Sequence, residues 1–116
     1  MGAKGDLKGA LASAEKALAG DAGHGKALGY RGVLLYELDR VDEAKPALQA
    51  AVDSGLPDGA VHFALARCLA ASGELTSALA QTDIALKDQP QNWAFQFVRA
   101  RLLRLLRLWI PSLLLP

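Results

Sequence analysis

The stretch GELTSALAQTDIALKDQP, residues 73–90, decides the fold, because its pattern occurs 34 residues earlier and, weakened, 34 residues before that. Two columns of the alignment keep alanine in all three copies: Ala10, Ala44 and Ala78, and Ala17, Ala51 and Ala85. Three more keep their chemistry: Leu18, Val52 and Leu86; Leu7, Val41 and Leu75; and Gly5, Asp39 and Gly73. Self-similarity at a fixed period of this length is typical of a repeat protein.

The other half of the period has its own columns: Leu28 and His62; Gly32, Ala66 and Ala100; and Leu35, Leu69 and Leu103. Within each half, apolar residues recur at steps of three and four, which indicates a helix with one buried face. Ala and Leu, the best helix formers, also dominate the composition. We therefore predict an all-α fold of helix-turn-helix units, with about six helices near residues 6–19, 26–38, 42–54, 59–71, 75–87 and 92–109.

Several residues mark the expected helix ends. Asp58 and Asn92 are predicted to cap the starts of the fourth and sixth helices. Three glycines are placed where a left-handed residue would end a helix: Gly20, Gly55 and Gly73. Pro46 lacks an N–H and lies about one turn into the third helix, so we expect it to delay the start of that helix or bend it.

At these residues the chain resembles the tetratricopeptide repeat, a helix-turn-helix unit with a small residue in its first helix, two alanines in its second and a closing proline. The best copy, residues 59–90, carries Leu65 and Ala66 in place of the Leu-Gly pair of the family. Its other motif positions hold Gly73, Leu75, Ala78, Ala85 and Pro90. The preceding copy matches through Gly32, Val41, Ala44 and Ala51, but departs at Arg31 and Leu56. A generic helical bundle is the alternative.

The resemblance implies a right-handed superhelical array of antiparallel helix pairs in a single domain, residues 1–110. The second helix of one repeat would occupy residues 5–22, full repeats 25–58 and 59–92, and the first helix of a further repeat 93–109, before an apolar tail at 111–116. Half-repeats at both ends are typical of a segment cut from a longer array.

In this family the first helices of successive repeats line a concave groove that receives a peptide. The resemblance places these residues in that groove: Lys26, Tyr30, Val33, Tyr36, Glu37, Phe63, Arg67, Ala70, Phe97, Arg101 and Arg104. An aromatic and basic groove suits a protein or peptide with apolar anchors and acidic groups. Ordinary helix packing is the alternative role for several of these aromatic residues. The carboxylate-clamp form of the family is not indicated, because none of these positions is Asn.

The last predicted helix, FQFVRARLLRLLRLWI at residues 95–110, is apolar over most of its circumference. Arg101, Arg104 and Arg107 form one polar stripe, since successive residues turn by about 100°. A face for oligomerisation or membrane-surface association is predicted at Leu102, Leu103, Leu106, Trp109 and Ile110. Truncation of a longer parent would expose the same surface.

Charge is distributed unevenly along the chain. All twelve acidic residues precede Trp93, whereas Arg99, Arg101, Arg104 and Arg107 follow it unopposed. A solvated stripe on a terminal helix is the ordinary explanation, and attraction to an acidic surface is the alternative. The acidic body and the Leu-rich companion face argue against nucleic acid as a partner.

Catalysis, cofactors and metals find no support in the sequence, so we expect a non-catalytic adaptor or scaffold. His24, His62 and Cys68 do not form a set at metal-ligand spacing, and the GDAGHG stretch at residues 20–25 matches no phosphate-binding loop. The N-terminus lacks the apolar core of a signal peptide, and the apolar run at 108–115 is too short to span a bilayer. A soluble, cytoplasmic protein is the expectation.

Overall fold

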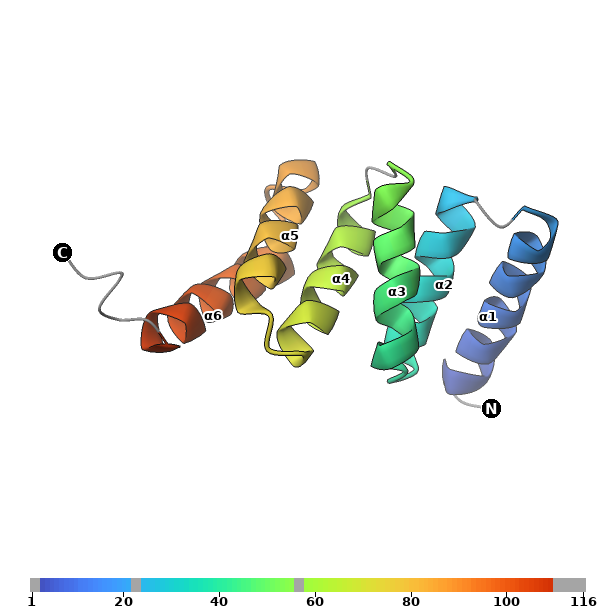
Figure 1. The fold of residues 1–116 in the computed structure, drawn as a ribbon, viewed down its shortest axis with the longest axis horizontal. Coiled ribbons are helices and arrows are strands. Elements are labelled where there is room, and N and C mark those ends of the chain that lie inside the picture. The colour runs from blue at the N-terminus through green and yellow to red at the C-terminus, as the bar shows by residue number, and fades with distance from the viewer. Residues whose placement is uncertain (1–2, 22–23, 56–57, 110–116) are drawn as a thin grey trace.

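The computed structural model describes residues 3–21, 24–55 and 58–109, and this part of the chain contains helices and the turns between them, with no strand. Its six helices are α1 (Ala3–Gly20), α2 (Gly25–Glu37), α3 (Val41–Asp53), α4 (Gly59–Ala71), α5 (Leu75–Asp88) and α6 (Trp93–Trp109). They follow one another in a row, with α1 and α6 at opposite ends (Figure 1). The all-α prediction is confirmed, and each predicted helix bound lies within three residues of the observed one.

The most extensive helix contacts join α2 to α3 and α4 to α5. Small residues make this close approach feasible. A Cβ added to Gly32 in α2 would lie 2.6 Å from the Leu48 side chain of α3. In the same column of the next copy Ala66 is fully buried, and opposite it Ala78 and Ala85 are fully buried in α5. The recurring small residues therefore hold the two helices of each pair together.

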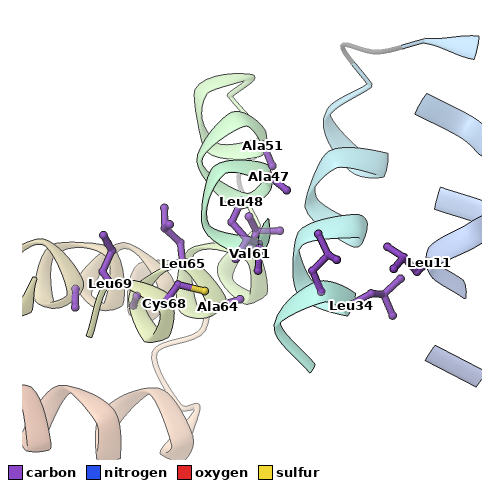
Figure 2. Close-up of a cluster of buried hydrophobic side chains, with 14 of the residues drawn as sticks. Leu11, Leu34, Ala47, Leu48, Ala51, Val61, Ala64, Leu65, Cys68 and Leu69 are labelled. Carbon is purple, nitrogen blue, oxygen red and sulfur yellow. The ribbon is translucent and has the colours of Figure 1, made fainter. Parts of the chain in front are cut away.

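A second kind of contact joins each of these pairs to its neighbours, through α1 with α2, α3 with α4, and α5 with α6. Leu11 of α1 and Leu34 of α2 lie beside each other in the core (Figure 2). The core continues through the fully buried Leu48 and Leu65 to Leu102 of α6. Because each helix packs on its neighbours in sequence, the buried residues form a band along the array.

One ion pair recurs at equivalent positions of this second contact. Arg31 Nε of α2 lies 3.5 Å from Glu15 Oε1 of α1. Two periods later, Arg99 Nε of α6 lies 2.7 Å from Asp83 Oδ1 of α5. Both ion pairs are partly exposed, so they contribute little to stability. They join equivalent residues in two copies of the repeat.

Among the described residues, three helix starts carry side-chain caps. The predicted caps are confirmed: Asp58 Oδ1 accepts from the Ala60 N–H at 2.9 Å, and Asn92 Oδ1 accepts from the N–H groups of Ala94 and Phe95. His24 adds a third cap, because its Nδ1 accepts from the Ala27 N–H at 3.1 Å. Each cap satisfies a backbone donor that the helix itself leaves free.

Two of the three predicted left-handed glycines are confirmed, with φ of 86° at Gly55 and 81° at Gly73. The prediction for Gly20 is wrong, because the Asp21 N–H bonds to the Ala17 carbonyl and the chain stays right-handed through Gly20. A delayed start at Pro46 is also wrong, since α3 begins at Val41. Pro46 is exposed, so water can satisfy the carbonyl that its missing N–H leaves unpaired.

Gly73 lies in a left-handed turn before α5 and Gly9 lies within α1, so the two glycines should respond in opposite ways to replacement by alanine. Gly73→Ala should lower the free energy of unfolding by about 1 kcal/mol, because a Cβ is unfavourable at positive φ. Gly9→Ala, in the middle of α1 with nothing within 4 Å of the added Cβ, should raise it by up to about 1 kcal/mol. Urea unfolding monitored by circular dichroism measures both. A neutral Gly73→Ala variant would contradict the turn conformation.

Candidate functional site

Four of the residues predicted for the groove lie around one hollow of about 320 Å³: Tyr36, Arg67, Ala70 and Arg101. Tyr36 comes from α2, Arg67 from α4 and Arg101 from α6. Ala70 is apolar, as is the remaining lining: Ala71, Leu75, Val98, Leu102 and Leu105. Helices α2, α4 and α6 thus each contribute one polar or aromatic side chain to an otherwise apolar depression, which we call the arginine hollow.

Aromatic rings hold the Arg67 guanidinium in place. Its Cζ lies 5.4 Å from the ring centroid of Tyr36 and 5.8 Å from that of Phe63. The Phe63 ring in turn packs on Phe95 with centroids 4.4 Å apart. A guanidinium over a ring face is attracted to the ring quadrupole and loses little hydration. Arg67 is therefore positioned before any ligand arrives.

The charge of the arginine hollow is uncompensated. Arg31, Arg40, Lys45 and Arg99 form ion pairs with carboxylates, whereas among the described residues neither Arg67 nor Arg101 has an acidic partner within salt-bridge distance. No Asp or Glu lines the hollow either, within the described part of the chain. Burial raises the pKa of the Tyr36 phenol, and the Arg67 charge opposes that rise. The hollow therefore presents positive charge beside apolar surface.

The other predicted groove residues do not share this hollow. Lys26, Tyr30 and Val33 line a separate depression of about 340 Å³ together with Asp58, Ala60 and Val61. Glu37, Phe97 and Arg104 are exposed and line neither depression. The residues predicted for a single groove thus line two separate hollows, one around Arg67 and one around Tyr30.

Sequence reasoning missed five lining residues of this hollow: Ala71, Leu75, Val98, Leu105 and Leu102, which it had assigned to another face. Ala71, Val98 and Leu105 could have been found from the sequence, because side chains three and four residues apart share a helix face. Ala71 follows Arg67 by four residues, Leu105 follows Arg101 by four, and Val98 precedes Arg101 by three. Leu75 belongs to the next helix, and only the packing of α5 places it there.

The predicted oligomer or membrane face of α6 needs correction at Leu102, which is 2% exposed and belongs to the core. Leu106 is half-buried, and Leu103 is 40% exposed. The most exposed leucine of α6 is one that the prediction omitted, Leu108, at 70%. The Trp109 side chain and Ile110 lie outside the described residues. The correction arises because α5 covers one side of α6.

Groups with catalytic chemistry are engaged in the fold. His62 Nδ1 lies 2.7 Å from Gln81 Oε1, a contact that ties α4 to α5. Cys68 is buried, and burial raises the pKa of its thiol, so the reactive thiolate is disfavoured. Residues 3–21, 24–55 and 58–109 contain no group of three metal-ligating side chains placed to hold an ion. Within the same residues, none of the helices has the length and apolar character needed to cross a bilayer.

Comparisons with known proteins support the helical-repeat fold. A family model described as "Tetratricopeptide repeat" matches residues 2–44 and 31–85. A chain in the solved structure of Naa15/Naa10 bound to HypK-THB superposes with a TM-score of 0.68 at 20% identity, covering 84% of this chain and 15% of that chain. Identity this low shows a shared fold alone, and this chain spans only a small part of that protein. No curated protein matches.

The contact between Arg67 and Tyr36 is testable by titration. In a Tyr30→Phe background, where Tyr36 is the remaining tyrosine, Arg67→Met should move the pKa of Tyr36 further above 10.0. The change removes the positive charge that stabilises the phenolate, while the Met side chain preserves much of the burial. Ultraviolet absorbance against pH measures the titration. Arg107→Met, which removes a charge outside the arginine hollow, is the control; equal shifts would contradict a specific contact.

Proposed function

This chain belongs to the tetratricopeptide repeat family, and we propose that it is a non-catalytic interaction module that binds a peptide or partner protein at the arginine hollow. Members of this family generally mediate protein–protein interactions and typically serve as scaffolds. One similar solved structure is that of Naa15/Naa10 bound to HypK-THB, so a chain of this fold takes part in a protein assembly there.

The observation that carries the proposal is the uncompensated charge of Arg67 and Arg101 beside an apolar lining. A carboxylate is the natural ligand for a guanidinium, because it accepts two parallel hydrogen bonds. The side chains of Leu75, Val98 and Leu105 offer apolar surface next to these charges. The partner we propose is therefore an acidic segment in which an apolar side chain stands close to Asp or Glu.

The helix pairs supply the framework for this site. We propose that α2 with α3 forms the repeat 25–58 and that α4 with α5 forms the repeat 59–92, within a single domain of residues 1–110. The extensive contacts within these two pairs support that division. In this arrangement α2, α4 and α6 are the first helices of successive repeats, so the arginine hollow draws on three repeats at once. Binding would then depend on the relative placement of all three.

A peptide-display selection against the immobilised chain tests the proposal. Enriched peptides should combine Asp or Glu with a neighbouring large apolar residue. Arg67→Glu and Arg101→Glu should each weaken binding of a selected peptide by about tenfold or more, because a charge-assisted hydrogen bond contributes about 1.5 kcal/mol or more. Fluorescence anisotropy of a labelled peptide provides the dissociation constants.

Arg107→Glu is the matched control, because it makes the same charge change on α6 at an exposed residue outside the arginine hollow. It should leave the affinity within about threefold, since exposed charges at a distance are largely screened by salt. All three variants should retain the helical circular dichroism of the parent. Enrichment of basic peptides, or equal losses in the Arg107 and Arg101 variants, would refute a specific acidic partner.

A further inference from the structure

The outer face of α6 repeats a pattern that is buried elsewhere in the chain. On α2 the columns of this face hold Leu28, Gly32 and Leu35, and α3 covers them; Gly32 and Leu35 are buried. On α4 the same columns hold His62, Ala66 and Leu69, all buried under α5. On α6 they hold Gln96, Ala100 and Leu103, all of which are exposed. No described helix takes the place of α3 or α5 there.

A hollow of about 400 Å³ marks the open position on α6. It is lined by Leu86, Pro90, Gln96, Arg99, Ala100 and Leu103. In the first copy the Leu48 side chain of α3 fills the equivalent space against Gly32, where an added Cβ would meet it at 2.6 Å. The other two copies thus indicate the type of occupant, which is a helix of the α3 and α5 type.

The chain itself contains such a helix with its complementary face open. Helix α1 belongs to the α3 and α5 type, because it occupies the same columns and packs on α2 as they pack on α4 and α6. Ala51 and Ala85 are fully buried against their partner helices, whereas their counterpart Ala17 on α1 is exposed. Ala10 is likewise only partly buried, although Ala44 and Ala78 in its column are fully buried.

Residue sizes at the two open faces are reciprocal. Gly25 and Gly59 begin α2 and α4, where an added Cβ would lie 2.7 Å from Ser54 Oγ and 2.6 Å from Asp88 Oδ2. The equivalent residue of α6 is Trp93, which is 76% exposed. The counterpart of Ser54 and Asp88 on α1 is Gly20, with nothing within 4 Å of an added Cβ. A large residue on α6 therefore corresponds to a small one on α1.

We propose that α1 of a second copy of this chain docks on the outer face of α6, so that the two half-repeats complete one repeat between chains. The contact is heterologous, since different surfaces of the two copies meet, and α1 and α6 lie at opposite ends of the array (Figure 1). Each added copy presents a new open end. Assembly therefore continues beyond a dimer, as an open or closing head-to-tail series.

Sedimentation velocity over a wide concentration range tests the proposal on the intact chain. The parent should show an average mass that rises with concentration past that of a dimer. Leu103→Glu on α6 and Ala17→Glu on α1 should each remain monomeric, because either change places a charge in a buried apolar contact. Both positions are exposed in the single chain, so circular dichroism should show unchanged folding.

Mixing these two variants provides the sharpest result. The Leu103→Glu chain retains an intact α1 face and the Ala17→Glu chain an intact α6 face, so an equimolar mixture should form a heterodimer and nothing larger. A symmetric contact between two α6 helices would instead let the Ala17→Glu chain dimerise by itself and leave the Leu103→Glu chain monomeric in the mixture. Such a result, with an assembling parent, would overturn the head-to-tail arrangement.

Matched controls make the same substitutions outside the two faces. Ala12→Glu changes an exposed alanine of α1 whose counterparts Pro46 and Ala80 are exposed, and Leu108→Glu changes an exposed leucine of α6 whose counterparts Arg40 and Glu74 are exposed. Both should assemble as the parent does. A parent that is monomeric at every concentration would refute the proposal. If that monomer also floated with phosphatidylserine vesicles and Leu103→Glu abolished the flotation, the face would bind membranes instead.

Discussion

The close approach of the two helices in each pair is the contact on which the rest of the structure depends. Gly32 lies so near to Leu48 that a single added carbon would have to displace the leucine. In the next pair, the fully buried Ala66 and Thr82 occupy the corresponding positions. The continuous core extends from these close contacts through the larger buried side chains to the neighbouring pairs.

An array built in this way has consequences at its ends as well as along its length. Each helix is stabilised by its immediate neighbours, so a terminal helix lacks one of the contacts that an internal helix makes. This explains why Ala100 and Leu103 are exposed while Ala66 and Leu69 are buried in the same columns. It also explains why the small-residue face of α1 is open. The two surfaces have a common origin in the repeat.

The hollow that we assign to partner binding depends on the opposite side of the same helices. Tyr36, Arg67 and Arg101 are far apart in sequence and meet because α2, α4 and α6 occupy equivalent places in successive pairs. The Phe63 ring contacts Arg67 and packs on Phe95, and neither ring adds charge to the hollow. A rigid aromatic support is well suited to a site that recognises a carboxylate, since little side-chain entropy is lost on binding.

Periodicity in the sequence was sufficient to predict the six helices, their pairing in a repeat of 34 residues and the caps at Asp58 and Asn92, because these features depend on local spacing and on single side chains. The family resemblance, rather than the periodicity, placed Tyr36, Arg67 and Arg101 in one groove. Only the tertiary structure separated the hollow of Lys26 and Tyr30 from that of Arg67, buried Leu102 and added Leu75. Those outcomes depend on how far α6 is covered by α5 and where α5 begins, which are properties of packing between helices rather than of any one period.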